Sequence, residues 1–267
     1  ELPELARQID EQLKSKPQRT GSALRKALDQ GTSDSQFPMD SETNLCLLRV
    51  CEQDRKCPRP LLSPELDALL AQLLHERKHV DTLAAVGLDP SKSAILVGPP
   101  GVGKTLTAQW VAEQLDMPFY ILDLSAVMSS LLGKSGGNIR AAFDFAKKSP
   151  CVLLLDEIDS IAKKRSDDSD IGELKRLVTV ILQEIDSWPS SSLLIAATNH
   201  RELIDPALWR RFDVIAEFKT PTDDAISTAV QRFLGPDLHR FGKWKDILSV
   251  AMRGNSFSDV EREILKL

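Results

Sequence analysis

The sequence has few cysteines, few aromatic residues and no long apolar segment. Its four cysteines, Cys46, Cys51, Cys57 and Cys151, do not have the spacing of a zinc site, and we expect ordinary reduced thiols. No apolar run approaches the roughly 20 residues that a membrane-spanning helix needs, and the acidic segment 1–10 does not resemble a signal peptide. The formal net charge of −5 argues against broad nucleic-acid binding. These absences predict a cytoplasmic globular protein without a membrane segment.

A glycine-rich segment stands at residues 98–105, where the sequence reads Gly-Pro-Pro-Gly-Val-Gly-Lys-Thr. It follows the apolar run 94–97 and precedes an amphipathic helical pattern, so the sequence predicts a strand, a loop and a helix. Glycines let successive backbone N–H groups point at one anion, Lys104 adds a positive charge for the β- and γ-phosphates, and Thr105 offers a hydroxyl to Mg²⁺. The segment therefore predicts a binding site for a nucleoside triphosphate. We expect contacts from Gly98, Pro99, Pro100, Gly101, Val102, Gly103, Lys104, Thr105 and Leu106.

Polar side chains follow two further apolar runs. Asp156 and Glu157 come directly after the run 152–155, and Asn199 follows the run 193–197. In open α/β sheets the ligand binds at the carboxyl ends of the strands. Asp156 is therefore expected to hold Mg²⁺ through water opposite Thr105, and Glu157 to activate the attacking water as general base. Asn199 would orient water or contact the γ-phosphate.

Short apolar runs alternate with helical patterns through the middle of the chain. The sequence predicts an α/β fold of the P-loop NTPase type, with a five-stranded parallel sheet flanked by helices, over residues 61–220. A helical accessory region is expected at 1–60, and a small helical lid at 221–267. The five strands are expected at 94–97, 119–122, 152–155, 193–197 and 214–218.

Four helices are expected ahead of the first of these strands, and the first two are short ones within residues 1 to about 35. Asn44–Cys51 reads as a short helix, and Ser63-Pro64-Glu65 is a typical helix start whose leucine stripe predicts a helix running towards Gly87. This helix contains His75 and His79 in the His-Glu-x-x-His pattern of zinc peptidases. Because no third ligand has the required spacing and both histidines fall off the leucine stripe, we favour an exposed polar face over a metal site.

From about Gly87 to Phe218 the chain resembles an AAA ATPase module. The resemblance rests on the phosphate loop, Leu-Leu-Leu-Asp-Glu-Ile-Asp, Ala-Ala-Thr-Asn and Asp-Pro-Ala-Leu-Trp-Arg-Arg-Phe-Asp, in the family's order. Within the family the chain is similar to the branch of the AAA proteases, katanin and spastin, and to compact bacterial members with one module. The resemblance implies hydrolysis of ATP with Mg²⁺ as cofactor, in a ring that we expect to be a hexamer. It assigns Asn199 a sensor role, and Arg210 and Arg211 the role of arginine fingers offered to the neighbouring subunit's nucleotide.

The chain departs from this family at two places. The loop that contacts a threaded protein has an aromatic residue in relatives, whereas the corresponding segment here is Leu131-Leu132-Gly133. This segment also reads as the end of a hydrophobic helix with a capping glycine. The segment 254–260 resembles the start of the family's second lid helix, with Ser258 near the adenine side. Relatives continue beyond the position of Leu267, which leaves a truncated lid and a deviant lid both open.

Three classes of function remain open from the sequence. The resemblance implies an ATPase that remodels or unfolds a protein partner, which the N-terminal helices would select. The missing aromatic residue before Gly133 instead favours a nucleotide-switched adaptor that regulates a partner enzyme such as a protease or nuclease. A nucleic-acid-directed ATPase is the third class, and the acidic balance of the chain disfavours it.

Overall fold

The computed structural model describes residues 38, 47–51, 57–124, 135–160 and 171–266. The chain divides into two compact units, Glu1–Phe37 and Pro38–Leu267, and every described residue belongs to the second. The helices expected within 1–37 and the segment Leu131–Gly133 therefore lie outside the described residues. None of the helices within the described ranges has the length and apolar character needed to cross a membrane.

Within the described residues, one sheet of six strands, in the order β1-β3-β4-β5-β2-β6, forms the centre of the fold. Strands β2 to β6 run parallel, which confirms the predicted fold class, whereas β1 pairs antiparallel with β3 at the sheet edge. The strands are β1 (Arg49–Val50), β2 (Ser93–Val97), β3 (Phe119–Asp123), β4 (Val152–Asp156), β5 (Leu193–Thr198) and β6 (Val214–Glu217).

Strand β1 corrects two predictions. The sheet has six strands rather than five, and residues 49–50 are extended rather than part of the helix expected at 44–51. Arg49 lies opposite Ile121 and Val50 opposite Tyr120, so the short strand pairs with the edge of β3. A run this short carries no periodicity that separates strand from helix, and the backbone groups of β3 decide the outcome.

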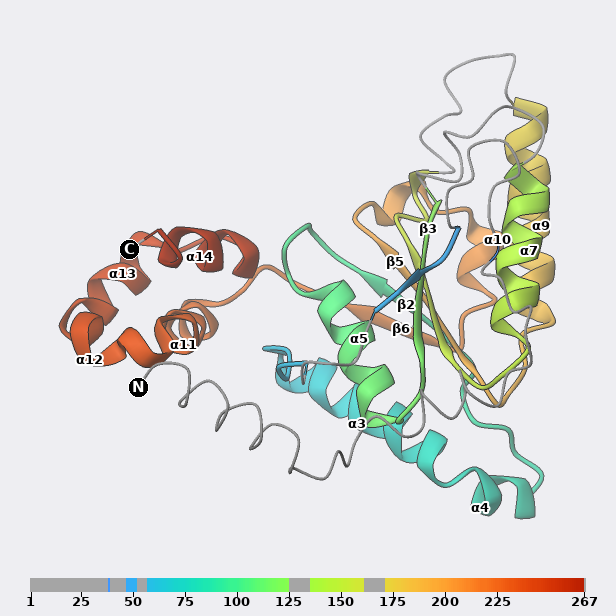
Figure 1. Ribbon diagram of the computed structural model, residues 1–267, viewed down its shortest axis with the longest axis horizontal. Coiled ribbons are helices and arrows are strands. Elements are labelled where there is room, and N and C mark those ends of the chain that lie inside the picture. The colour runs from blue at the N-terminus through green and yellow to red at the C-terminus, as the bar shows by residue number, and fades with distance from the viewer. Residues whose placement is uncertain (1–37, 39–46, 52–56, 125–134, 161–170, 267) are drawn as a thin grey trace, which may run out of the picture. The chain divides into compact units, whose positions relative to one another are not determined.

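Helices cover both faces of the sheet (Figure 1). Helices α3 (Pro64–Lys78) and α5 (Lys104–Gln114) pack on one face, where Val152 and Leu154 point. Helices α7 (Ser135–Ala146), α9 (Ile171–Asp186) and α10 (Pro206–Trp209) pack on the other face, together with Leu153 and Leu155. Because the central strands β2, β4 and β5 are buried on both faces, their apolar residues are continuous, as the sequence pattern predicted.

The helix expected from Ser63 towards Gly87 is broken at His79. Ser63 caps α3 as predicted, with its Oγ accepting the N–H of Leu66 at 3.4 Å. The backbone of His79 (φ −120°, ψ 40°) leaves the helical region, and a separate helix α4 (Val80–Ala85) follows. No residue of α4 is buried. Apolar packing therefore stabilises the helix as far as Lys78 and gives no reason for it to continue.

Helices also fill the C-terminal part of the chain. They are α11 (Asp223–Leu234), α12 (Leu238–Phe241), α13 (Lys245–Ala251) and α14 (Phe257–Ile264), with 3₁₀ turns at Gly235–Asp237 and Gly242–Trp244, and a further turn at Arg201–Leu203 precedes α10. Ile226, Val230, Met252 and Val260 belong to an apolar cluster of their own. We refer to residues 221–266 as the lid.

Candidate active site

The glycine-rich loop joins the carboxyl end of β2 to the first turn of α5, as the sequence predicted. Two of its glycines are required by geometry. A Cβ on Gly98 would lie 2.3 Å from the backbone oxygen of Phe218, so a side chain would push the loop away from the end of β6. Gly101 has a φ of +77°, in the left-handed region that L-residues rarely adopt. The loop therefore keeps its path only with glycine at both positions.

Lys104 lies at the centre of the site. Its side chain is almost fully buried, and its Nζ donates to the backbone oxygens of Gly98 and Pro99 at 2.7 and 2.8 Å and to Oδ1 of Asn199 at 2.7 Å. Burial lowers the pKa of Lys104, and the carboxylates of Asp156 and Asp159 act in the opposite direction. The ammonium thus joins the loop at the end of β2 to the end of β5, where phosphate oxygens could replace its present acceptors.

The predicted acidic pair lies at the carboxyl end of β4. Thr105 Oγ1 lies 3.5 Å from Asp156 Oδ2, so a hydroxyl and a carboxylate face each other across the mouth of the loop. Oxygen donors of this kind suit Mg²⁺, which fills its remaining positions with water and phosphate oxygens. The residues present therefore fit the cation that the sequence implied.

Glu157 adopts a strained backbone conformation. Its φ is +52°, and its N–H donates to Asp156 Oδ1 at 3.0 Å. A non-glycine residue in the left-handed region costs about 1–3 kcal/mol, and such strain is concentrated at functional positions. The turn leaves the Glu157 side chain exposed beside the Asp156 carboxylate, where it can reach a water molecule.

Asp159 is a residue of the site that the sequence reasoning missed. It is buried, and its Oδ1 accepts the hydroxyl of Thr198 at 3.0 Å and the backbone N–H of Asn199 at 3.4 Å. These contacts tie the end of β5 to the turn after β4 and so fix the position of Asn199. The signal was available in Leu-Leu-Leu-Asp-Glu-Ile-Asp, whose last residue is Asp159.

Arg210 and Arg211 lie between α10 and β6 in different environments. Arg210 is exposed, and none of the described residues pairs with its guanidinium. Arg211 is partly buried, and its Nε lies 2.7 Å from Oδ1 of Asp186 at the end of α9. Both arginines precede β6 and therefore lie at the amino ends of the strands, whereas the phosphate loop lies at the carboxyl ends. Arg210 is thus free to meet another molecule, and Arg211 is held within the chain.

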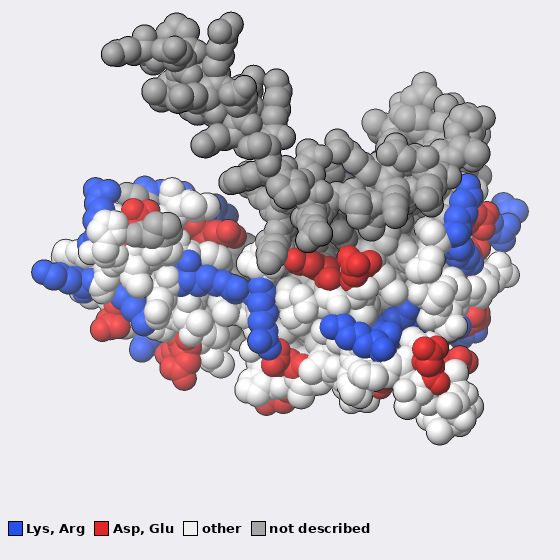
Figure 2. Space-filling model, turned by 60° about the horizontal axis from the view of Figure 1, so that its bottom comes forward, with Lys and Arg blue, Asp and Glu red and all other residues white. Residues whose placement is uncertain are grey.

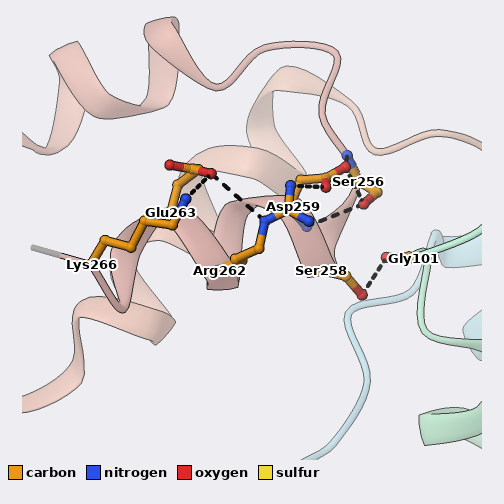
Figure 3. A network of polar contacts seen from close by, with 7 residues as sticks. All are labelled: Gly101, Ser256, Ser258, Asp259, Arg262, Glu263 and Lys266. Carbon is orange, nitrogen blue, oxygen red and sulfur yellow. Dashed lines mark hydrogen bonds and ion pairs between the residues drawn. The ribbon is translucent and has the colours of Figure 1, made fainter.

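The lid contacts the phosphate loop through the first turn of α14 (Figure 3). The backbone N–H and hydroxyl of Ser258 lie 3.1 and 3.5 Å from the carbonyl oxygen of Gly101. Ser256 and Asp259 form a reciprocal cap at the start of this helix. The hydroxyl and N–H of Ser256 hold the pKa of Asp259 below its usual range, with a further contribution from Arg262. The first turn of α14 is thereby fixed against the loop.

Replacing Gly101 with alanine is expected to separate the lid from the loop. A Cβ there would lie 2.3 Å from Ser256 Oγ and 2.8 Å from Ser256 Cβ, and the left-handed backbone would be strained by about 1–3 kcal/mol. Limited proteolysis of the segment 219–222 should become faster. Gly103→Ala is the matched control, because Gly103 also has a positive φ (+93°) but has open space around its Cβ position. Equal cleavage rates in both variants would contradict the lid contact.

The histidine pair lies on the surface of α3, away from the phosphate loop. The rings of His75 and His79 are exposed and 4.2 Å apart, and Nδ1 of His79 lies 2.9 Å from the backbone oxygen of His75. Glu76, which would be the general base of a peptidase, accepts the hydroxyl of Ser91 at 2.6 Å and an amide N–H of Gln72 at 2.9 Å. Among the described residues, no group of three or more potential ligands gathers here or elsewhere to hold a metal ion.

A parallel sheet with a glycine-rich loop at the end of β2 and Asp156–Glu157 at the end of β4 defines a P-loop nucleoside triphosphatase. Residues 94–220 match the model of the ATPase family associated with various cellular activities (AAA). The chain is 35% identical over 267 residues to the uncharacterized AAA family ATPase y4kL of Sinorhizobium fredii (strain NBRC 101917 / NGR234), covering 95% of this chain and 79% of that protein. The chain belongs to the AAA family and is an ATPase, which confirms the resemblance.

Two further similarities extend this result. The chain is 34% identical over 210 residues to the proteasome-activating nucleotidase of Methanococcus maripaludis (strain C6 / ATCC BAA-1332), covering 71% of this chain and 52% of that protein. It therefore spans about half the length of that nucleotidase. Among solved structures, the crystal structure of the FIGL-1 AAA domain is similar with a TM-score of 0.66 at 24% identity, covering 82% of this chain and 73% of the other. At this identity the likeness shows a shared fold.

Proposed function

We propose that the chain hydrolyses ATP with Mg²⁺ at a site shared between neighbouring subunits of a ring, and uses the energy to remodel a protein partner. The observation that carries this proposal is the convergence on Lys104. Its ammonium contacts the phosphate loop and Asn199, and it lies within the electrostatic influence of Asp156 and Asp159. These elements are separated in sequence and meet at one edge of the sheet.

ATP would bind with its phosphates in the loop at 98–103. Backbone N–H groups of the loop and of the first turn of α5 would donate to the phosphate oxygens, aided by the positive end of the helix. Lys104 would exchange the oxygens of Gly98 and Pro99 for β- and γ-phosphate oxygens. Thr105 and Asp156 would hold Mg²⁺, which when bound neutralises the charge that develops on the phosphates. Ser258 would lie on the adenine side.

Glu157 is the proposed general base, and Asn199 the residue that senses the γ-phosphate. The Glu157 carboxylate would accept a proton from the attacking water, because its strained turn directs it away from the buried core. Asn199 already accepts a hydrogen bond from Lys104. A γ-phosphate that drew Lys104 away would free the Asn199 side chain. The environment of Asn199, at the end of β5, would then differ between the ATP-bound and the nucleotide-free site.

The ring is proposed from the position of Arg210. Arg210 is exposed and unpartnered among the described residues, but it lies at the amino ends of the strands, opposite its own phosphate loop. A group in that position would reach the nucleotide of a neighbouring copy rather than its own. An arginine supplied in this way is worth about 10³–10⁵ in rate where it has been measured. We propose that Arg210 and Arg211 act in trans and that the ring is a hexamer.

A protein partner is proposed from the relatives. The name of the matched nucleotidases says that they activate the proteasome. From this similarity we propose that the present chain also acts on a protein. The rival, a nucleotide-switched adaptor, is favoured by the absence of an aromatic residue at Leu131–Gly133. Loss of fluorescence from a green fluorescent protein with an unstructured tail, dependent on ATP, would support remodelling. Binding of that protein without unfolding would support the adaptor.

A nucleic-acid partner is disfavoured by the charge distribution. Figure 2 shows Lys and Arg interspersed with Asp and Glu over the described residues of one face, rather than a continuous basic surface. The net charge of −5 adds to this argument. Binding to DNA that weakened steeply with salt concentration would be the result that revives the alternative.

The shared site predicts that ATPase activity depends on the concentration of the chain. The rate per chain should rise with concentration until the ring is complete, because each site obtains an arginine only from a neighbour. Binding of ATP to the isolated chain should show no such dependence, since the phosphate loop belongs to one subunit, and it serves as the control. A rate per chain that stayed constant down to concentrations at which sedimentation shows monomers would contradict the shared site.

A further inference from the structure

Residues Ser93 and Asp213 form a cluster of hydrogen bonds at the amino ends of β2 and β6. The Asp213 Oδ2 atom accepts from the backbone N–H groups of Lys92 and Ser93 at 2.9 and 3.0 Å. The Ser93 hydroxyl lies 2.9 Å from the same carboxylate oxygen and accepts the backbone N–H of Asp213 at 3.1 Å. These two residues are 120 positions apart in sequence, so the cluster is a tertiary connection between two strands.

The cluster is hydrogen-bonded to the backbone of the arginine pair. Ser93 Oγ lies 3.2 Å from the backbone oxygen of Arg211, so its one hydrogen can be shared between this oxygen and the Asp213 carboxylate. Lys92 adds a second tie, because its Nζ donates to the backbone oxygen of Asp186, whose side chain pairs with Arg211. The segment that carries Arg210 and Arg211 is therefore held at both its backbone and a side chain.

Burial gives this connection its strength. Ser93 is fully buried and every residue of β2 is buried, so the Ser93 hydroxyl has no access to water. A buried hydroxyl without a partner is costly, and the same low-dielectric surroundings strengthen its hydrogen bonds. The position of the Arg211 backbone is therefore fixed relative to the amino end of β2.

We propose that Ser93 and Asp213 are positioning residues for the arginine pair, and that they hold Arg210 where it can reach the neighbouring subunit's nucleotide. We refer to the hydrogen bonds that join Ser93, Asp213 and the Arg211 backbone as the clamp. This inference rests on the proposed function in trans. The clamp also joins two sites through one strand, because β2 carries the clamp at its amino end and the phosphate loop of its own subunit at its carboxyl end. Strand β2 thus fixes the position of the arginine offered to the neighbour relative to the loop that binds this subunit's nucleotide.

The Ser93→Ala variant is expected to lower kcat about 10- to 100-fold, because small displacements of a catalytic group cost rates of this order. KM and the affinity of the isolated chain for ATP should change little, since the phosphate loop is untouched. Ser192→Ala is the matched control: Ser192 is equally buried, precedes β5 and accepts the N–H of Cys151 at 3.2 Å, and none of its hydrogen bonds to described residues involves the arginine segment. It should lose comparable stability and keep its kcat. Equal kcat losses in both variants would overturn the clamp.

A mixing experiment separates positioning from general damage. Glu157→Gln subunits keep Ser93, Asp213 and both arginines, so they should offer intact fingers to Ser93→Ala subunits and restore their hydrolysis above that of either variant alone. Arg210→Ala mixed with Glu157→Gln is the reference. If Arg210→Ala is rescued and Ser93→Ala is not, the clamp is wrong while the shared site stands. If neither is rescued, the trans assignment itself fails, and the clamp with it.

Asp213→Asn provides a second variant in case Ser93→Ala folds poorly. It keeps the size of the side chain but weakens the acceptor for the N–H groups of Lys92 and Ser93. We expect the same pattern at smaller size: a lower kcat, unchanged ATP affinity and rescue by Glu157→Gln subunits. The double variant should lose less activity than the product of the single losses, because both changes break one network. Independent, multiplicative losses would overturn the inference.

Discussion

Replacing Glu157 with glutamine is expected to lower the rate of ATP hydrolysis by about 10²–10⁴-fold while ATP binding is retained. Glutamine has the size of glutamate but cannot accept the proton of the attacking water. The phosphate loop, Lys104 and Asp156 remain in place, so the nucleotide should still bind. Phosphate release in steady state and the affinity for a fluorescent ATP analogue measure the two effects separately.

Glu202→Gln is a suitable control for the loss of charge. Glu202 is an exposed carboxylate near the same edge of the sheet, and it pairs with His200 at 3.0 Å rather than facing the loop. This variant should hydrolyse ATP at close to the rate of the unmodified chain. Hydrolysis by Glu157→Gln within a few-fold of that rate would contradict the role of Glu157 as general base.

The second large effect is expected from Arg210→Ala, which should lower kcat by about 10³–10⁵-fold and leave ATP affinity unchanged. The guanidinium is exposed, and no described residue pairs with it, so its removal breaks no ion pair within the described part of the subunit. The variant should therefore show a large loss of rate in steady-state hydrolysis but an unchanged melting temperature. Substoichiometric Arg210→Ala subunits should also lower the activity of rings of the unmodified chain.

Two other arginines serve as comparisons for Arg210. Arg253 is equally exposed but pairs with Asp223 on the lid at 3.1 Å, so Arg253→Ala should keep its kcat. Arg211→Ala should lower kcat and also release Asp186, since Arg211 is held by that carboxylate. A normal kcat for Arg210→Ala would remove the main support for the shared site.

The phosphate loop and the acidic pair could be predicted because each needs only consecutive residues. Gly98–Thr105 carries its function in the backbone path and in Lys104, and a strand followed by Asp156–Glu157 places both carboxylates at the ligand-binding edge of a parallel sheet. The strands that precede these motifs are continuous apolar runs, so their positions in the sequence and the parallel class of the sheet were also predicted. This part of the fold follows from short-range patterns.

The remainder depends on contacts between distant residues. Asp159 holds Thr198 and Asn199 from the turn after the neighbouring strand, and Ser93 meets Asp213 over 120 positions, so both contacts join residues far apart in the sequence. Strand β1 exists because the edge of β3 accepts it. The helix breaks at His79, and none of the residues of α4 that follow is buried. In each case tertiary packing decides a result that local propensity leaves undetermined.

The account's central claim is that each ATP site is completed by the next subunit, and mixing two inactive variants tests it most directly. Glu157→Gln subunits lack the base but offer Arg210, whereas Arg210→Ala subunits lack the finger but keep Glu157. Random mixing in equal amounts should place about a quarter of all subunits beside a suitable neighbour, so hydrolysis should reappear at roughly that fraction of the normal rate. A mixture as inactive as its two components, although both variants assemble together, would contradict the claim.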